Sequence, residues 1–336
     1  MRLVRYEGNP ILKPNPEHPW ESMVTTNPGA WYDEARGEVL LLYRAAGFDE
    51  QHVIRLGLAR SRDGRHFERQ PEPVFGPSID GFDAGCVEDP RVVRMNDYFY
   101  ITYASRPFPP GQYWLNDHLP YRAPACPPEF PQRLRSNATA TGLALTRDFK
   151  TFIRAGQITD PLVDDRNAIL FSERIGGEFW MLHRPMEWLG RSYGTDYPAI
   201  WVAHGRDLLS MRDSRLLCTA QQPWERKIGA NTPPIRTEYG WLLLYHAVGP
   251  DSRYRLGAML LKLDEPTRVL HRTPEWLLEP EMDYEVDGMY AGCVFPCGKV
   301  VIDGVLHVYY GGADRFVGLA TCPLDELLRH LRSCPA

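Results

Sequence analysis

The sequence has no long apolar run and little helical periodicity. Within its 336 residues, no apolar stretch approaches the roughly 20 residues that a membrane-spanning helix needs, which argues against that class of protein. The first residues show no charged segment followed by an apolar core, so we expect no secretory leader and a cytoplasmic location. Helical spacing of apolar residues is clearest at 323–332, which predicts a short C-terminal helix.

Basic charge and paired cysteines are also scarce. The formal net charge is −5 and no basic stripe is present, which argues against nucleic acid or an anionic membrane as a partner. The seven cysteines are odd in number and scattered, which suits a reducing compartment better than a disulfide scaffold. Cys293 and Cys297 lie close together, but no second Cys/His pair completes a zinc site. We therefore expect buried strand cysteines, no metal and no cofactor.

A repeated motif is present instead. Five times, an apolar and aromatic run ends in small or polar residues, at intervals of roughly 60, 80, 62 and 64 residues. The five runs are LLLYRA (40–45), YITYAS (100–105), WMLHRP (180–185), LLLYHA (242–247) and VYYGGAD (308–314). Their polar residues are of types that bind sugars and anions. If the repeat brings these residues to a common axis, five parts of the chain build one pocket.

A second motif follows each of these runs. It begins as a short strand with Gly or Ala, where a neighbour approaches closely, and in most copies it turns near an Asp. Its copies lie at 55–67, 140–152, 200–211, 255–266 and 316–327. Strand signals with frequent turns predict an all-β chain, and five repeats predict a five-bladed β-propeller that forms a single domain over residues 1–336. The alternative is a β-sandwich whose internal resemblance is accidental.

One segment interrupts the repeat. Residues 106–135 are rich in proline, which disfavours a central strand, and they explain the longer interval of 80 residues. The segment also contains several aromatic residues, so we do not expect a disordered linker. It predicts either a loop that walls the pocket or a contact with another subunit.

Four further stretches carry residues suited to chemistry. They are TTNPGAWY (25–32), CVEDPRVV (86–93), DDRNAILF (164–171) and ERKIGANTPPI (225–235). Each is expected just ahead of an innermost strand. Asn27, Asp89, Arg166, Asn167 and Lys227 would then face the axis beside the polar ends of the runs.

The charges of these residues suggest the ligand. Arg166, Arg184, Lys227 and His246 would converge, whereas few carboxylates occupy comparable positions. Crowded cations repel one another and lose solvation, so the cluster predicts a bound anion such as phosphate. A glycosidase that inverts the configuration of the anomeric carbon needs two carboxyl groups. One carboxyl group is enough if phosphate is the nucleophile. Asp89 is the candidate general acid, and the alternative is a salt bridge to Arg91 that only fixes the strand.

The ordered motifs resemble glycoside hydrolase family 130, the mannoside phosphorylases and related β-mannosidases. The resemblance runs over most of the chain, from NPGA and LLYRA through EDPRV, LHRP and KIGA to FPCG and YYGGAD. It implies a five-bladed propeller and inverting phosphorolysis of a β-mannoside to α-mannose 1-phosphate and a shortened acceptor. The main expectation is a β-1,4-mannooligosaccharide, or a mannosyl-glucose or mannosyl-GlcNAc type of substrate.

The resemblance also implies roles for individual residues. Asp89 matches the family's general acid, whose proton reaches the bridging oxygen by way of the mannose 3-hydroxyl. The residues that match phosphate ligands are Arg166, Arg184, Lys227 and His246. The substrate-binding residues are Asn27, Arg44 and Asp314, which match positions that hold the mannosyl unit, together with Asn167.

Three alternatives stay open from the sequence. The first is a β-1,2-mannoside phosphorylase on the same scaffold. The second is a β-mannoside hydrolase, which needs a carboxylate base and would have to use Glu225 or Glu285. The third is a noncatalytic sugar-binding propeller. A homo-oligomer is also compatible with the aromatic loop.

Overall fold

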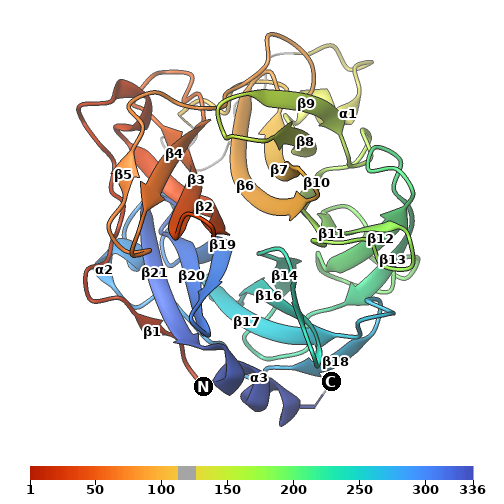
Figure 1. The fold of residues 1–336 in the computed structure, drawn as a ribbon. Coiled ribbons are helices and arrows are strands. Elements are labelled where there is room, and N and C mark those ends of the chain that lie inside the picture. Colours follow the sequence, from red (N-terminus) through yellow and green to blue (C-terminus); the bar gives the residue numbers. More distant parts are fainter. Residues whose placement is uncertain (113–125, 336) are drawn as a thin grey trace.

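The computed structural model describes residues 1–112 and 126–335, and it shows five small antiparallel sheets arranged in a ring (Figure 1). The predicted all-β five-bladed propeller is therefore confirmed, as is the short C-terminal helix, α3 (Leu324–Arg332). The single-domain organisation over 1–336 stays a prediction. No helix of the described residues is both long enough and apolar enough to cross a membrane.

The strands of the first three blades follow chain order from the axis outward. Blade 1 consists of β2 (Val24–Asp33), β3 (Glu38–Ala46), β4 (Arg55–Ser61) and β5 (Glu68–Arg69). Blade 2 consists of β6 (Cys86–Met95), β7 (Tyr98–Arg106), β8 (Ala140–Thr146) and β9 (Phe152–Gln157). Blade 3 consists of β10 (Asp165–Leu170), β11 (Phe179–Pro185), β12 (Ile200–Gly205) and β13 (Arg212–Cys218).

The last two blades depart slightly from this pattern. Blade 4 consists of β14 (Lys227–Ala230) and β15 (Ile235–Thr237), which both pair with β16 (Gly240–Val248), and then β17 (Tyr254–Leu261) and β18 (Val269–Arg272). Blade 5 consists of β19 (Val294–Ile302), β20 (Val305–Gly312), β21 (Phe316–Pro323) and, as its outermost strand, β1 (Val4–Arg5). The short helices are η1 (Pro19–Glu21), α1 (Gln132–Arg135) and α2 (Asp283–Val286).

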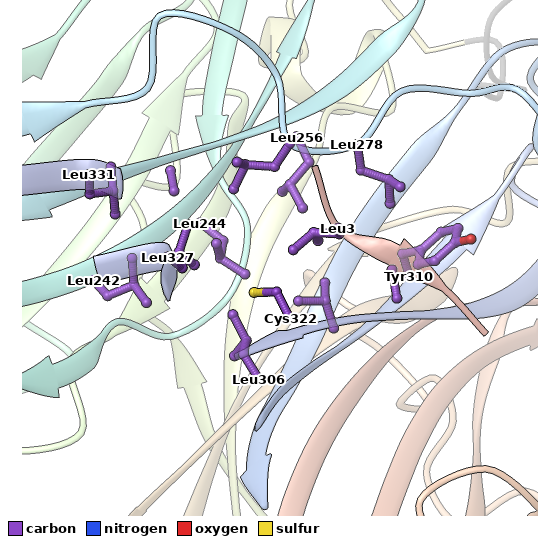
Figure 2. Packing of buried hydrophobic residues seen from close by; sticks show 14 of the residues in the cluster. Leu3, Leu242, Leu244, Leu256, Leu278, Leu306, Tyr310, Cys322, Leu327 and Leu331 are labelled. Carbon is purple, nitrogen blue, oxygen red and sulfur yellow. The ribbon is translucent and has the colours of Figure 1, made fainter. Parts of the chain in front are cut away.

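The first and last strands of the chain meet in blade 5, where β1 pairs with β21 and closes the ring (Figure 1). Leu3, just ahead of β1, is buried among leucines of blades 4 and 5 and of α3, including Leu256, Leu327 and Leu331 (Figure 2). Full burial of such a side chain contributes about 1.5–3 kcal/mol. The closure therefore rests on apolar packing as well as on strand pairing.

The sequence assigned the strands to the wrong layers. The apolar runs with polar ends are the second strands of the blades, and the Gly/Ala motifs are the third. The four stretches expected ahead of the innermost strands lie within them, in β2, β6, β10 and β14. The outermost strands were not predicted because they are short or contain few buried residues, and so carry little apolar signal.

A buried polar triad recurs in four blades. In blade 4, Tyr245 donates to Glu225 over 2.7 Å, and Arg272 donates to both the Tyr245 hydroxyl and the Glu225 carboxylate, over 3.1 and 2.6 Å. At Gly257, on the next strand, a Cβ would lie 2.5 Å from the Tyr245 ring, so glycine is required there. The equivalent triads are Tyr43–Glu21–Arg69, Tyr103–Asp83–Arg154 and Tyr310–Glu285–Arg5. Each carboxylate is neutralised, which makes its burial tolerable.

Blade 3 lacks this triad. The tyrosine position is taken by His183 and the glycine position by Trp201. His183 bonds to Asp165 through Nδ1 over 2.7 Å, and the other oxygen of Asp165 accepts the backbone N–H of Arg184 over 3.1 Å. In blade 3 the buried carboxylate of Asp165 therefore holds the backbone of Arg184, a predicted site residue, instead of pairing with a structural arginine.

The proline-rich insertion connects β7 to β8, and its residues 113–125 lie outside the described part. At its base, Arg106 donates to the Asn137 carbonyl over 2.5 Å. The Asn137 side chain also exchanges two hydrogen bonds with the backbone of Phe108. These contacts fix both stems of the insertion beside the innermost strand of blade 2.

Candidate active site

Irregularities in three innermost strands turn the predicted site residues toward the axis. Asn27, Asp89 and Asn167 have φ values of 45°, 52° and 56°, in the left-handed region that non-glycine residues seldom occupy. The pairing register shifts at each of them, so that two residues oppose one on the neighbouring strand. Such a bulge redirects a side chain out of the regular alternation of the strand. The same kind of bulge thus directs a predicted site residue in blades 1, 2 and 3.

Blade 4 places a glycine near the axis. A Cβ at Gly229 would lie 2.5 Å from the His246 ring, 2.7 Å from the Arg184 guanidinium and 2.8 Å from the Asn167 amide nitrogen. Gly229 therefore leaves the space that lets three predicted site residues meet. Gly229 was not predicted as a site residue, although the KIGA motif contains it.

A cavity opens where these strands meet, with an empty volume of about 570 Å³ counting its open mouth. Seven of the nine predicted site residues line it: Asn27, Arg44, Asp89, Arg166, Asn167, Arg184 and Asp314. Lys227 and His246 lie directly behind this lining, where they contact Tyr254 and Arg184 respectively. The lining residues that the sequence analysis did not propose are Glu88, Ala104, Arg106, Thr139, Tyr254, Cys293 and Phe295. All nine predicted residues are thus brought together.

Acidic side chains gather on one side of the cavity. The Asp89 carboxylate accepts from the Asn27 amide over 2.8 Å and from Arg44 over 3.4 Å. Arg44 also pairs with Glu88 over 3.1 Å, and Asn27 reaches Asp314 over 3.4 Å. Burial raises the pKa of Asp314, and neighbouring Asp89 adds to this, while Arg44 opposes it. We call Asn27, Arg44, Glu88, Asp89 and Asp314 the acidic half.

The carboxylate of Asp89 does not form the salt bridge to Arg91 that was the alternative to a catalytic role. Arg91 instead donates to the backbone carbonyl of Asp89 over 2.6 Å. The carboxylate therefore stays directed toward Asn27, Arg44 and the cavity.

Cationic side chains form the other side, and we call Arg166, Arg184, Lys227 and His246 the basic half. His246 accepts from Arg184 through Nε2 over 2.5 Å and faces Asn231 through Nδ1 over 2.6 Å. Because a guanidinium can only donate, Nε2 is the acceptor and Nδ1 carries the proton. Burial lowers the pKa of His246, and Arg184 and Lys227 lower it further, which keeps the ring neutral.

The basic half holds little negative charge. Within residues 1–112 and 126–335, the one ion pair found among its members joins Arg166 to Asp164, through two bonds of 2.8 Å. Burial tends to raise the pKa of Asp164, but these bonds lower it overall. Burial lowers the pKa of Arg184 to about 10. The pKa of Lys227 is lowered to about 7, first by burial and then by the positive charges of Arg184 and Arg166.

Two buried nitrogen donors on this side of the cavity have no hydrogen-bond partner among the described residues. They are Nε of Arg184 and Nδ2 of Asn167. A buried donor without a partner is costly, so such groups in a cavity indicate a ligand that accepts from them. Together with the neighbouring cations, the Arg184 donor makes this half suited to an oxyanion.

No group of three or more His, Cys, Asp or Glu side chains in the described residues is arranged to hold a metal ion. Cys293 and Cys297 are buried in and beside β19, and burial raises the pKa of both thiols. The expectation of buried cysteines is confirmed at both positions, with Cys297 in the strand and Cys293 just ahead of it, whereas the absence of metal and cofactor stays a prediction.

Comparison with known proteins identifies the family. The profile of glycoside hydrolase family 130, described as β-1,4-mannooligosaccharide phosphorylase, matches residues 2–109 and 135–333. The 1,2-β-oligomannan phosphorylase of Thermoanaerobacter sp. (strain X514) is 33% identical over 334 residues, which cover 97% of this chain and 99% of that protein. The chain belongs to glycoside hydrolase family 130.

Two further comparisons agree with this assignment. The β-1,2-mannobiose phosphorylase of the same Thermoanaerobacter strain is 32% identical, over 97% of this chain and 99% of that protein. The solved structure of β-1,2-mannobiose phosphorylase from Listeria innocua, in complex with β-1,2-mannobiose, has a TM-score of 0.79 and 28% identity, and the match covers 98% and 99% of the two chains. The family resemblance read from the motifs is thus confirmed, and the chain is an enzyme of this mannoside phosphorylase family.

The candidate bases of the hydrolase alternative lie elsewhere. Glu225 is bonded to Tyr245 and Arg272, and Glu285 to Tyr310 and Arg5, within the triads of blades 4 and 5. Neither glutamate lines the cavity. Neither glutamate is therefore placed to act as that base, and the carboxylate found beside the basic half in the described residues, Asp164, is bonded to Arg166.

Proposed function

We propose that this family 130 enzyme cleaves a β-mannoside with inorganic phosphate and releases α-mannose 1-phosphate. The observation that carries the proposal is the division of one cavity into an acidic half around Asp89 and a basic half around Arg184. A general acid and an anionic nucleophile on opposite sides of a sugar are what inverting phosphorolysis requires.

In the proposed reaction, phosphate is held by Arg166, Arg184 and Lys227, with His246 behind Arg184. A phosphate oxygen forms a bond to the anomeric carbon while the bond to the bridging oxygen breaks on the opposite face, which converts the β-configuration to α. The leaving oxygen takes a proton that Asp89 supplies, by way of the mannose 3-hydroxyl as the family resemblance implies. Asn27, Arg44, Asn167 and Asp314 hold the mannosyl unit.

For the linkage, we infer a β-1,2-linked mannoside rather than the β-1,4 type that the sequence first suggested. The Thermoanaerobacter and Listeria relatives that carry β-1,2 names match this chain over nearly its whole length. A β-1,4-mannooligosaccharide phosphorylase of Ruminococcus albus is 28% identical over 98% of this chain. The relatives thus support β-1,2 as the first linkage to test and β-1,4 as the second.

The test is incubation with β-1,2-mannobiose, β-1,4-mannobiose and mannosyl-β-1,4-glucose, each with and without phosphate. Proton NMR of the anomeric region distinguishes α-mannose 1-phosphate from free mannose. We expect α-mannose 1-phosphate only when phosphate is present, and at the highest rate from the β-1,2 substrate. Equal release of free mannose in both buffers would instead support the hydrolase, and no product from any substrate would support the sugar-binding propeller.

The remaining expectations accompany this proposal. A β-mannoside oligosaccharide and phosphate are the proposed small-molecule partners, and no cofactor is needed for the reaction as written. The cytoplasmic location, a homo-oligomeric state and the absence of nucleic-acid or membrane partners stay predictions.

A further inference from the structure

Arg91 lies at the centre of the molecule and has no role in the proposed reaction. It is two residues from Asp89 on β6, and it is only 2% exposed. Its guanidinium faces the innermost strands of several blades, since it contacts Asn167 of β10 and Asn231 just beyond β14. The ring centroid of Phe295, on β19, lies 5.7 Å from the Arg91 Cζ.

Every nitrogen of this guanidinium has an acceptor, and each acceptor belongs to a different blade. Nη1 donates to the Asp89 carbonyl over 2.6 Å, Nη2 to the Asn167 amide oxygen over 3.2 Å, and Nε to the Asn231 carbonyl over 3.1 Å. The Asp89 and Asn167 contacts hold two of the left-handed bulges described above. The planar guanidinium is thus bonded to blades 2, 3 and 4 at once.

The hydrogen bonds continue from Arg91 to the phosphate side. The side chain of Asn231, whose carbonyl accepts from Arg91, also accepts from His246 over 2.6 Å. His246 in turn accepts from Arg184 over 2.5 Å. One continuous network therefore connects the backbone of the general acid with the guanidinium that faces the phosphate.

The charge of Arg91 is also unusual. All three acceptors are neutral oxygens, and in the described ranges no carboxylate lies within ion-pair distance of it. A buried cation of this kind is expensive, and a structural strut would be cheaper to build from neutral groups. Its positive field acts on the basic half, since it lowers the pKa of both Arg184 and His246.

We infer that Arg91 is a positioning residue that holds Asp89 and the phosphate-facing Arg184 in one rigid frame and adds positive potential at the phosphate site. The inference rests on the proposed function. It assigns the last residue of the EDPR motif a task in catalysis, acting through the groups that contact the substrates. The competing explanation is a strut that serves only folding.

The test compares Arg91→Lys with Arg94→Lys. Arg94 is on the same strand, is exposed, and packs on the Phe99 ring with Cζ 5.3 Å from its centroid, so it provides a matched control. Lysine keeps the charge at position 91 but cannot make three bonds in a plane. We expect Arg91→Lys to lower kcat on the order of 100-fold and to raise the KM for phosphate about tenfold, because misplacement by about 1 Å has effects of this size. Arg94→Lys should keep both constants.

A second variant tests the network independently of the folding of Arg91→Lys. Asn231→Ala breaks the link to His246, so we expect a higher KM for phosphate with little change in the KM for the mannoside. In the double variant the two losses should be less than multiplicative, since both act on one network. Thermal shift by added phosphate provides a measure of binding that does not depend on turnover.

The outcomes separate the inference from the proposed function. If wild-type protein shows no phosphate-dependent cleavage of any mannoside, the proposed function fails. Suppose that the wild type is active and that Arg91→Lys only lowers the yield of folded protein. If kcat per folded molecule and the KM for phosphate are then unchanged, the inference alone is overturned. Fully multiplicative losses in the double variant would overturn the proposed network as well.

Discussion

The acidic and basic halves of the cavity differ in the partners that their charged groups have. In the acidic half, Asp89 and Glu88 share the guanidinium of Arg44, and Asn27 donates to both Asp89 and Asp314. Each of these three carboxylates thus has a donor from the protein before any substrate arrives. In the basic half, the described residues supply one carboxylate, Asp164, for a cluster of three cationic residues and a neutral histidine.

This difference shows which substrate each half is built to accept. A neutral sugar adds hydroxyl groups that can donate and accept, so it fits a half whose carboxylates already accept from groups of the protein. In the basic half, burial and the repulsion between neighbouring cations lower the pKa of Arg184 and Lys227. An arriving phosphate removes that repulsion, so binding energy becomes available on the side of the nucleophile.

The backbone also differs between the halves. Asn27, Asp89 and Asp314 have left-handed backbones at bulges or at the end of a strand. Arg184 and His246 lie on regular second strands instead. Asn27, Asp89 and Asp314 are thus aimed by local backbone conformation. Arg184 and His246 are instead aimed by their side chains and by the space left at Gly229.

The largest effect is expected from removing the acid. Asp89→Asn keeps the shape of the side chain but cannot supply a proton, so kcat should fall on the order of 10²- to 10⁴-fold. Steady-state release of α-mannose 1-phosphate measures this loss. Asp97→Asn, at an exposed position just beyond the same strand, is the control and should keep wild-type turnover. Near-normal turnover of Asp89→Asn would place the acid elsewhere in the acidic half.

A smaller and more selective effect is expected in the basic half. Arg184→Ala removes a charged donor to phosphate, and such a bond contributes about 1.5–3 kcal/mol, which corresponds to a KM for phosphate raised about 10- to 100-fold. The KM for the mannoside should change far less, and initial rates with each substrate varied in turn measure both. Arg174→Ala, an exposed arginine of the same blade, is the control. If both constants rose equally, the division into two halves would be wrong.

The basic half should also respond to pH. Because the pKa of Lys227 is lowered to about 7, its amine is charged below pH 7 and neutral above it. Bound phosphate favours the charged form and raises this pKa, so binding above pH 7 takes up a proton. We expect the KM for phosphate to rise between pH 7 and 9, by at most about tenfold per pH unit. In Lys227→Met the KM should be higher and its profile flatter, and an unchanged profile would argue against this titration.

The smallest effect on activity is expected from a change outside both halves. Tyr245→Phe removes the hydroxyl that bonds Glu225 and Arg272 in the triad of blade 4. Losing a buried hydrogen-bonded group costs about 1–3 kcal/mol, so the free energy of unfolding should fall while both KM values persist. Urea denaturation measures the first and initial rates the second. A changed KM for phosphate would mean that the triad next to His246 belongs to the basic half.

Much of the site could be predicted because its residues recur in the repeat. Arg44, Arg184, His246 and Asp314 fall at the ends of the apolar runs, and equivalent positions in a propeller approach one axis. Asp89 and Lys227 came from two of the four further stretches, and the family motifs supported their roles. The layers were predicted wrongly, since a local apolar pattern does not distinguish an innermost strand from the second strand of a blade.

The groups that escaped prediction depend on contacts between distant segments. Arg91 and Asn231 are 140 residues apart in the chain but share a hydrogen bond. Gly229 matters because side chains of three other strands occupy the space beside it. Glu225 and Glu285 could serve as a base by composition, and only their bonds within the triads exclude them from the cavity.

The sequence by itself thus determined the number of blades, the family and the residue types of the cavity, because repetition and motif order are properties of the chain. The tertiary structure decided which side chains share charge, which carboxylates are neutralised and how the acid is connected to the phosphate side. Those outcomes depend on distances across the axis, where burial and neighbouring charges set the protonation and direction of each group.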